Sequence, residues 1–149
     1  MKKPLRMHHV GIVLPTLQDA KEFINRMGLE IDYSGYVQAY HADLIFTTKG
    51  ENSSPIEFII PHEGVLCEFN HGKGGIAHLA FEVEDVEETR REYEAQGYKM
   101  LEKAAVQGTD DIIVNFMRPS YNNGILVEFV QTVAPINRET ANPFQSLHH

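Results

Sequence analysis

The chain has 149 residues, the size of one compact domain or of two small, similar halves. It carries 13 Lys and Arg residues against 21 Asp and Glu residues, so its formal net charge is −8. That charge argues against nucleic acid and against an anionic membrane surface as partners, because both attract basic proteins. A single cysteine excludes an intrachain disulfide and a cysteine-rich zinc site. Composition leaves open what eight histidines do in an acidic chain.

The chain shows no sign of a membrane span or of export. Its apolar stretches are too short to cross a bilayer. Residues 1–6 are basic but lack the apolar core of a signal peptide. With only one cysteine, the chain fits a reducing compartment, and we expect a cytoplasmic protein.

The predicted elements follow the same order in the two halves of the chain. Thr16 and Asp85 are helix caps, and Gly28 and Gly97 are helix stops. In the first half we expect a strand, the helix and three more strands, at about 8–14, 16–28, 30–37, 42–48 and 55–60. In the second half we expect them at about 78–83, 85–97, 98–103, 111–117 and 124–131.

This order predicts an α+β fold made of two tandem βαβββ modules. We expect a single domain over residues 1–132, with modules at 7–61 and 75–131 and a C-terminal tail over 133–149. Each module begins with a histidine in a strand and ends with a glutamate in a strand. His9 and His78 are 69 residues apart, and Glu57 and Glu128 are 71 residues apart.

These four residues are the candidate metal ligands. Glu57 and Glu128 each lie between apolar neighbours in a strand, where an unpaired carboxylate would be costly to bury. Two residues after the histidines come Gly11 and Ala80, which leave space beside the imidazoles because alternate strand residues share a face. Imidazole and carboxylate ligands suit zinc, nickel, cobalt, manganese or iron(II). We therefore predict one divalent metal ion held by His9, Glu57, His78 and Glu128.

We expect ordinary structural roles for the other residues of chemical interest. His8 should point to the face opposite His9, and Cys67 should be a small apolar filler. Asp110 and Asp111 read as a solvated turn. Three histidines lie beside turns and have no counterpart in the other half: His41, His62 and His71. Six bulky side chains are candidates for the wall of a substrate pocket, although we favour ordinary core and loop packing for them: Tyr33, Tyr36, Tyr40, Phe46, Met117 and Tyr121.

Over about residues 7–131 the chain resembles the vicinal oxygen chelate superfamily, which includes glyoxalase I, extradiol dioxygenases and bleomycin-resistance proteins. The motifs are His-His-Val-Gly-Ile, Ile-Glu-Phe, Ala-His-Leu-Ala-Phe and Leu-Val-Glu-Phe, which carry His9, Glu57, His78 and Glu128. The resemblance implies a curled mixed sheet that forms a cup around a metal, and it implies a homodimer.

Within the superfamily the chain looks most like the methylmalonyl-CoA epimerase branch. Phe116-Met117-Arg118-Pro119 and the Gly124-Ile125-Leu126-Val127-Glu128 ending are similar to that branch, as is Gly74-Gly75-Ile76-Ala77-His78. The branch usually carries a catalytic glutamate in a segment after the first helix. The corresponding segment here, Val37-Gln38-Ala39-Tyr40, has none.

The predicted function is an epimerase or isomerase that acts through a metal-stabilised enolate on a small acyl substrate, such as a CoA ester, or on a 2-oxo substrate. Glu128 is our first choice for the base and Glu57 our second. Three alternatives stay open: a glyoxalase I-like lactoylglutathione lyase, an iron(II) dioxygenase and a metal-free binding or resistance protein. This fold hosts several reactions, so the fold alone does not choose among them.

Overall fold

The structure, a computed structural model, describes residues 5–51, 54–136 and 138. Most of the predicted C-terminal tail lies outside these residues, so its boundary stays a prediction. Within the described part, no helix has the length and apolar character needed to cross a membrane.

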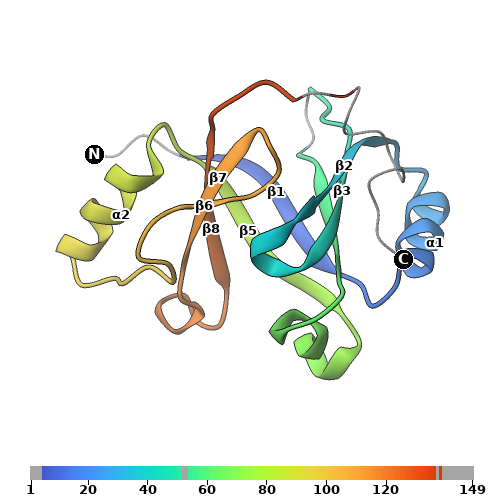
Figure 1. The fold of residues 1–149 in the computed structure, drawn as a ribbon, viewed down its shortest axis with the longest axis horizontal. Helices are drawn as coiled ribbons and strands as arrows, with labels where there is room; N and C mark the ends of the chain where they lie inside the picture. The colour runs from blue at the N-terminus through green and yellow to red at the C-terminus, as the bar shows by residue number, and fades with distance from the viewer. Residues whose placement is uncertain (1–4, 52–53, 137, 139–149) are drawn as a thin grey trace.

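The described residues form one curled mixed sheet with an α-helix on either side of the molecule (Figure 1). The first half contributes β1 (Arg6–Val13), α1 (Leu17–Met27), β2 (Ile31–Val37), β3 (Ala42–Thr47) and β4 (Ile56–Pro61). The second half contributes β5 (Gly75–Glu82), α2 (Val86–Ala95), β6 (Val106–Gln107), β7 (Ile112–Met117) and β8 (Leu126–Thr132). Three 3-10 segments connect the strands: η1 (Gln38–Tyr40), η2 (Val65–Gly72) and η3 (Pro119–Tyr121).

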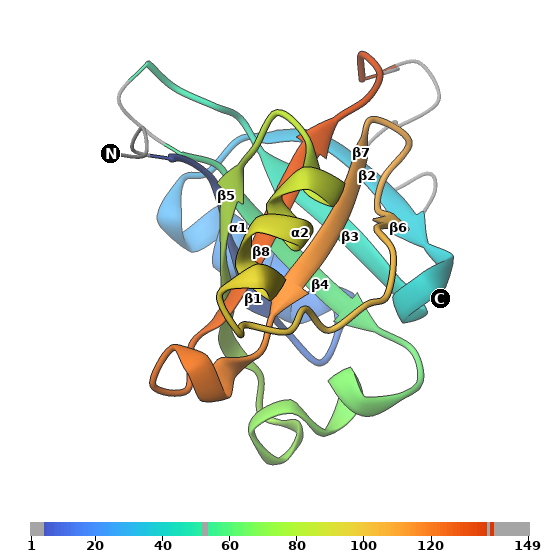
Figure 2. The same cartoon turned by 90° about the vertical axis from the view of Figure 1, so that its left-hand side faces the viewer.

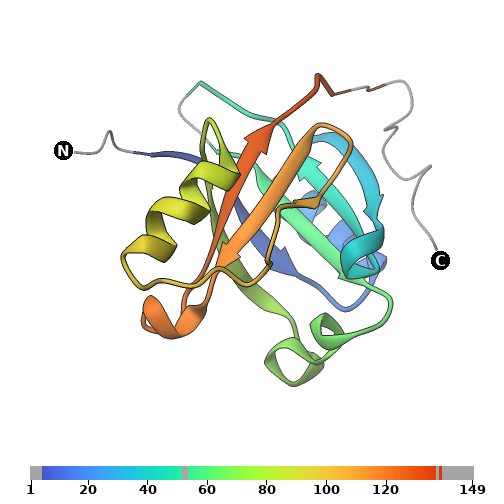
Figure 3. The ribbon, with the colours of Figure 1, turned by 60° about the vertical axis from the view of Figure 1, so that its left-hand side comes forward.

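The strand order makes the two halves mirror one another about the centre of the sheet. The eight strands lie in the order β2-β3-β4-β1-β5-β8-β7-β6. In each half the first strand pairs in parallel with the last, and the antiparallel pair β1 and β5 joins the halves. The sheet curls around its inner face (Figures 2 and 3). The predicted α+β fold of two tandem βαβββ modules is confirmed.

The first helix begins and ends where the sequence predicts. The Thr16 hydroxyl accepts a hydrogen bond from the Asp19 N–H at the N-terminus. Gly28 ends the helix in the left-handed conformation, φ 66°, which glycine adopts without strain. Ala20 and Ile24 pack against Ile12 and Phe58 of the sheet, so the apolar stripe of α1 covers the outer face of the first module.

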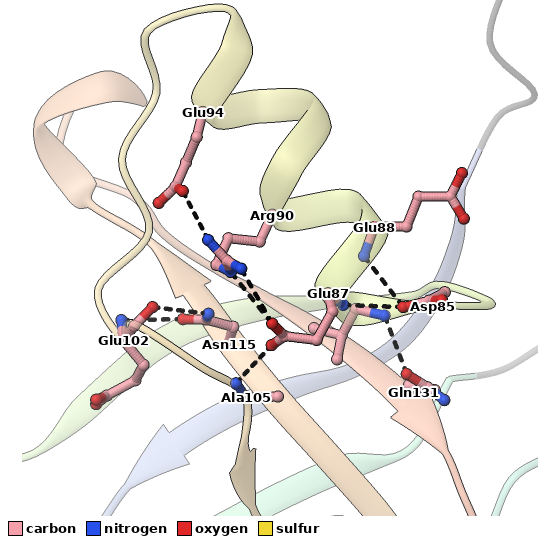
Figure 4. Close-up of polar contacts among 10 residues, drawn as sticks. Asp85, Glu87, Glu88, Arg90, Glu94, Glu102, Ala105, Asn115 and Gln131 are labelled. Carbon is pink, nitrogen blue, oxygen red and sulfur yellow. Dashed lines mark hydrogen bonds and ion pairs between the residues drawn. The ribbon is translucent and has the colours of Figure 1, made fainter.

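The second helix is held by its cap and by one carboxylate that reaches the next loop (Figure 4). Asp85 Oδ1 accepts hydrogen bonds from the N–H groups of Glu87 and Glu88. The Glu87 side chain accepts from the Ala105 N–H and from Arg90. These contacts tie α2 to the loop before β6. They matter for the position of the helix because Val86 is its only buried residue.

The predicted strand over 98–103 is wrong, because a side chain replaces the backbone ladder there. Asn115 of β7 accepts a hydrogen bond from the Glu102 N–H and donates one to the Glu102 carbonyl (Figure 4). Apart from one isolated bridge between Met100 and Met117, the segment makes no strand pairing in the described structure. The short strand β6 at Val106–Gln107 takes its place at the edge of the sheet.

Two further expectations about single residues are wrong. Cys67 is exposed, because it lies on η2, outside the sheet and its helices. Asp111 is buried rather than solvated, since it accepts hydrogen bonds from Thr109 Oγ1 at 2.6 Å and from Tyr33 Oη at 3.3 Å. Tyr33 belongs to the first module, so Asp111 joins the two halves. Asp110 is exposed, as predicted.

Candidate metal centre

The pairing of β1 with β5 places each candidate histidine opposite a small residue of the other strand. Gly11 is the partner of His78, and Ala80 is the partner of His9. A side chain on Gly11 would overlap the His78 imidazole, with its Cβ 2.6 Å from Nε2. The small residues predicted to leave space beside the imidazoles therefore do so, each for the histidine on the facing strand.

The two glutamates reach the same place from the strands that flank this central pair. Glu57 of β4 is the parallel partner of Gly11, and Glu128 of β8 is the parallel partner of Ala80. Each module thus contributes one histidine and one glutamate on one stretch of the inner face. All four side chains are buried, and His9 has no exposed surface.

The structure brings all four predicted residues together. The two Nε2 atoms of His9 and His78 are 3.0 Å apart. Glu128 Oε1 lies 3.0 Å from His9 Nε2 and 3.2 Å from His78 Nε2. Glu57 Oε1 lies 3.4 Å from both Nε2 atoms.

The arrangement fits a divalent metal ion. Ligands at about 2.0–2.2 Å from one metal lie roughly 3–3.5 Å from one another, and each glutamate oxygen lies at such a distance from both imidazole nitrogens. The ligand atoms of His9, Glu57 and His78 all lie within 4.8 Å of one another. Two imidazole nitrogens at 3.0 Å cannot both point a proton at the other, and Glu128 Oε1 is buried without a hydrogen-bond partner among the described residues. A cation between the four atoms would satisfy these contacts. Neutral imidazole and carboxylate suit zinc, nickel, cobalt, manganese or iron(II).

The charges of the four groups are strongly coupled in the metal-free protein. Burial alone would lower the pKa of each histidine, but the glutamates outweigh it and raise the pKa of His9 to about 9 and that of His78 to about 10. Because the two Nε2 atoms lie 3.0 Å apart, only one of them carries a proton between the rings at a time, so the raised pKa belongs to the pair. Burial alone would raise the pKa of each carboxyl, but His9 and His78 hold the pKa of Glu57 and of Glu128 below their usual range. A metal at this site must therefore displace protons from the imidazoles.

His8 lies beside this centre in the structure, although its place in the sequence predicts that it faces away from His9. A register irregularity in the β1–β5 ladder falls between Met7 and His9, so His8 has no pairing partner on β5. The alternation of side chains between the two faces of the sheet breaks at this residue. His8 Nδ1 lies 2.7 Å from His9 Nδ1, within hydrogen-bond distance. This contact fixes the His9 ring so that its Nε2 faces the other ligands. No pattern in the sequence announces such a bulge.

Three residues of the cluster, Glu57, His78 and Glu128, form part of the wall of a cavity of about 220 Å³ inside the cup. The rest of the wall is mainly aliphatic, with Leu44, Ile59, Val114 and Leu126 among its residues. The cavity is smaller than the roughly 300–1,000 Å³ of sites that enclose drug-sized ligands. It suits a small acyl group whose remaining part extends from the mouth.

The other candidates from the sequence divide between wall and core. Tyr40 lines the cavity. Tyr33 and Phe46 stack in the core with ring centroids 4.7 Å apart. His41 pairs with Glu63 at 3.0 Å, and His62 pairs with Asp43. These two histidines have structural partners, as predicted.

The fold and the buried His/Glu cluster define a class of duplicated βαβββ proteins whose curled sheet holds imidazole and carboxylate groups at its centre. A family model described as the Glyoxalase/Bleomycin resistance protein/Dioxygenase superfamily matches residues 8–116. The chain belongs to this superfamily, which confirms the resemblance seen in its sequence motifs. Members of the superfamily usually bind a divalent metal.

Among the similar proteins are methylmalonyl-CoA epimerases. The ethylmalonyl-CoA/methylmalonyl-CoA epimerase of Cereibacter sphaeroides is 32% identical over 132 residues, which cover 85% of this chain and 97% of that protein. The mitochondrial methylmalonyl-CoA epimerase of Bos taurus is 23% identical over 129 residues, which cover 85% of this chain and 74% of that protein.

Two solved structures show the same fold. The methylmalonyl-CoA epimerase of Mycobacterium tuberculosis has a TM-score of 0.78 at 23% identity, covering 86% of this chain and 88% of that chain. A variant of the Streptomyces coelicolor methylmalonyl-CoA epimerase, in complex with 2-nitronate-propionyl-CoA, has a TM-score of 0.79 at 21% identity. That match covers 89% of this chain and 100% of the other.

Proposed function

We propose that the protein is a divalent-metal-dependent epimerase that inverts the carbon next to the carbonyl of a small acyl-CoA. The observation that carries the proposal is the buried cluster of His9, His78, Glu57 and Glu128, of which the last three line an apolar cavity. Its support from relatives is the identity with the Cereibacter sphaeroides epimerase. From the family resemblance we also expect a homodimer, which light scattering of the purified protein tests.

The chemistry of such a reaction begins with removal of an acidic C–H proton. A divalent metal, when bound, would act as a Lewis acid that stabilises the negative charge developing on the carbonyl oxygen. His9 and His78 would hold it as neutral ligands. The apolar wall excludes water, which strengthens every electrostatic contact inside the cavity.

We assign the role of base to Glu128, with Glu57 as second choice. The histidines keep both carboxylates ionised, which is the state from which a base must start. Of the two, Glu128 Oε1 lies 3.0 and 3.2 Å from the imidazole nitrogens but makes no well-aligned hydrogen bond in the described structure. The glutamates come from opposite modules, an arrangement that suits removal of a proton from one side of the carbon and its return from the other.

The test follows exchange at the reacting carbon. Metal-loaded protein is incubated in heavy water with methylmalonyl-CoA or ethylmalonyl-CoA, and deuterium at C2 is measured by mass spectrometry above a protein-free blank. We expect incorporation with the wild type and with the control Glu84→Gln, whose glutamate is exposed. Glu128→Gln should lose at least about a hundredfold in exchange rate, the contribution typical of a positioned base. Full exchange in that variant would refute the assignment of the base.

The same preparations separate the other candidate reactions. Oxygen consumption with a catechol would indicate an iron(II) dioxygenase. Such an enzyme needs open coordination positions on the iron, and Glu57 as a fourth protein ligand would occupy one of them. Tight binding of a small molecule by protein without any stoichiometric metal would indicate a binding or resistance protein. Turnover of the glutathione adduct of methylglyoxal would indicate a lyase.

A further inference from the structure

The hydroxyl of Tyr40 has no partner in the site described above. Tyr40 ends η1, between β2 and β3 of the first module. Its hydroxyl is buried, and within the described residues it has no hydrogen-bond partner. Buried hydroxyls in native proteins nearly always have a hydrogen-bond partner, so one without a partner calls for an explanation.

The ring of Tyr40 is held in the wall that contains the His/Glu cluster. It meets the Phe116 ring edge to face, with centroids 5.8 Å apart, and the Phe116 ring lies 6.0 Å from the His78 ring. Among the described residues that line the cavity, Tyr40 is the one polar side chain besides Glu57, His78 and Glu128. The aromatic contacts therefore fix the ring while its hydroxyl stays available to a molecule in the cavity.

The surroundings decide whether this hydroxyl donates or accepts a proton. Burial raises the pKa of Tyr40 well above its usual value, and the carboxylates of Glu102, Glu128 and Glu57 raise it further. The phenol therefore keeps its proton throughout the range in which proteins work. It is suited to donate a hydrogen bond and unsuited to carry a proton to and from carbon.

We propose that Tyr40 donates a hydrogen bond to the substrate oxygen that becomes negatively charged when the neighbouring C–H proton is removed. The inference rests on the proposed function and adds a catalytic residue to it. A hydrogen-bond donor placed in advance where charge develops, in a cavity shielded from water, lowers the barrier without moving. The substrate class follows: an acyl group with an aliphatic side chain and one carbonyl oxygen within reach of both the cluster and Tyr40.

The experiment compares wild type with Tyr40→Phe, which keeps the ring and removes the hydroxyl. The probe is 2-nitronate-propionyl-CoA, in which the negative charge sits on oxygen as it would in an enolate. Isothermal titration of the metal-loaded proteins should show affinity about tenfold to hundredfold lower for Tyr40→Phe, the worth of a hydrogen bond to a charged group. Deuterium exchange and epimerisation of methylmalonyl-CoA should fall by one common factor. Tyr98→Phe, a change at an exposed tyrosine, should match the wild type in all three measurements.

The outcomes separate this inference from the proposed function. Equal probe affinity for wild type and Tyr40→Phe would overturn the role of Tyr40 and leave the proposed function standing. Exchange retained with epimerisation lost would also overturn it, because Tyr40 would then be a proton carrier. Loss of metal from Tyr40→Phe, measured by elemental analysis, would show a structural role instead. If the wild type neither binds the probe nor exchanges deuterium, the proposed function is refuted, and this inference fails with it.

Discussion

Gly11→Ala is the substitution that tests most sharply how the strand register builds the centre. Gly11 lies across from His78, and its backbone has no positive φ, so alanine meets no backbone strain there. Its new Cβ would lie 2.6 Å from His78 Nε2 and closer still to Cε1 and Nδ1. Since non-bonded heavy atoms need about 3.5 Å, the ring must move by at least roughly 1–1.5 Å.

A shift of that size removes His78 as a ligand, because metal–ligand distances tolerate only about 0.2 Å. Perturbing even the partner of a ligand typically lowers metal affinity about 10–100-fold, so losing a ligand should lower it by at least about 100-fold. The added methyl group in a packed interior should also cost about 1–3 kcal/mol of folding free energy.

Competition with a chromophoric chelator measures the metal affinity of Gly11→Ala, and urea denaturation measures the stability of the metal-free protein. Gly35→Ala is the matched control, since it adds the same methyl group to a strand where the nearest atom is Thr109 Cγ2 at 3.3 Å. We expect the control to bind metal like the wild type. A Gly11→Ala variant that binds metal within about threefold of the wild type would refute the assignment of His78 as a ligand.

Three further predictions concern the protons, the support of His9 and the second helix. With the pKa of His9 at about 9 and that of His78 at about 10, metal affinity should rise at least tenfold per pH unit between about 6 and 8, and a flat profile would contradict proton displacement. The same raised pKa values stabilise the metal-free fold fully below about pH 6.5, and urea titrations should show this contribution fading as pH rises toward 9–10. His8→Ala should weaken metal binding about 10–100-fold in the chelator assay with the fold intact, and unchanged affinity would disprove its contact with His9. Asp85→Ala should lower the free energy of unfolding by about 1 kcal/mol, whereas Asp110→Ala, at an exposed residue, should lower it by less than about 0.5 kcal/mol.

The duplicated pattern in the sequence was enough to predict the modules and the four residues that meet. His9 and His78, like Glu57 and Glu128, occupy equivalent places in strands that the parallel and antiparallel pairings bring to the centre of the sheet. Gly11 and Ala80 were predicted as the small neighbours of the histidines in sequence. Each instead makes room for the histidine of the other strand, and only the register shows that.

The failures share one physical cause, contacts that a local pattern does not contain. His8 turns toward His9 because of an irregularity in the ladder with β5. Asp111 is buried because Tyr33, 78 residues away in the chain, donates a hydrogen bond to it. The predicted strand at 98–103 gives way to the side chain of Asn115. Tyr40 read as ordinary packing, and only the cavity shows its hydroxyl to be unpartnered.

The central claim is that one divalent ion held by His9, Glu57, His78 and Glu128 makes a carbon next to a carbonyl exchange its proton. The most direct measurement titrates the metal-free protein with cobalt(II) and follows deuterium incorporation into methylmalonyl-CoA at each step. We expect exchange to rise in proportion to added metal and to stop rising at one equivalent per chain. Exchange at full rate in the metal-free protein, or none at one equivalent with either methylmalonyl-CoA or ethylmalonyl-CoA, would contradict it.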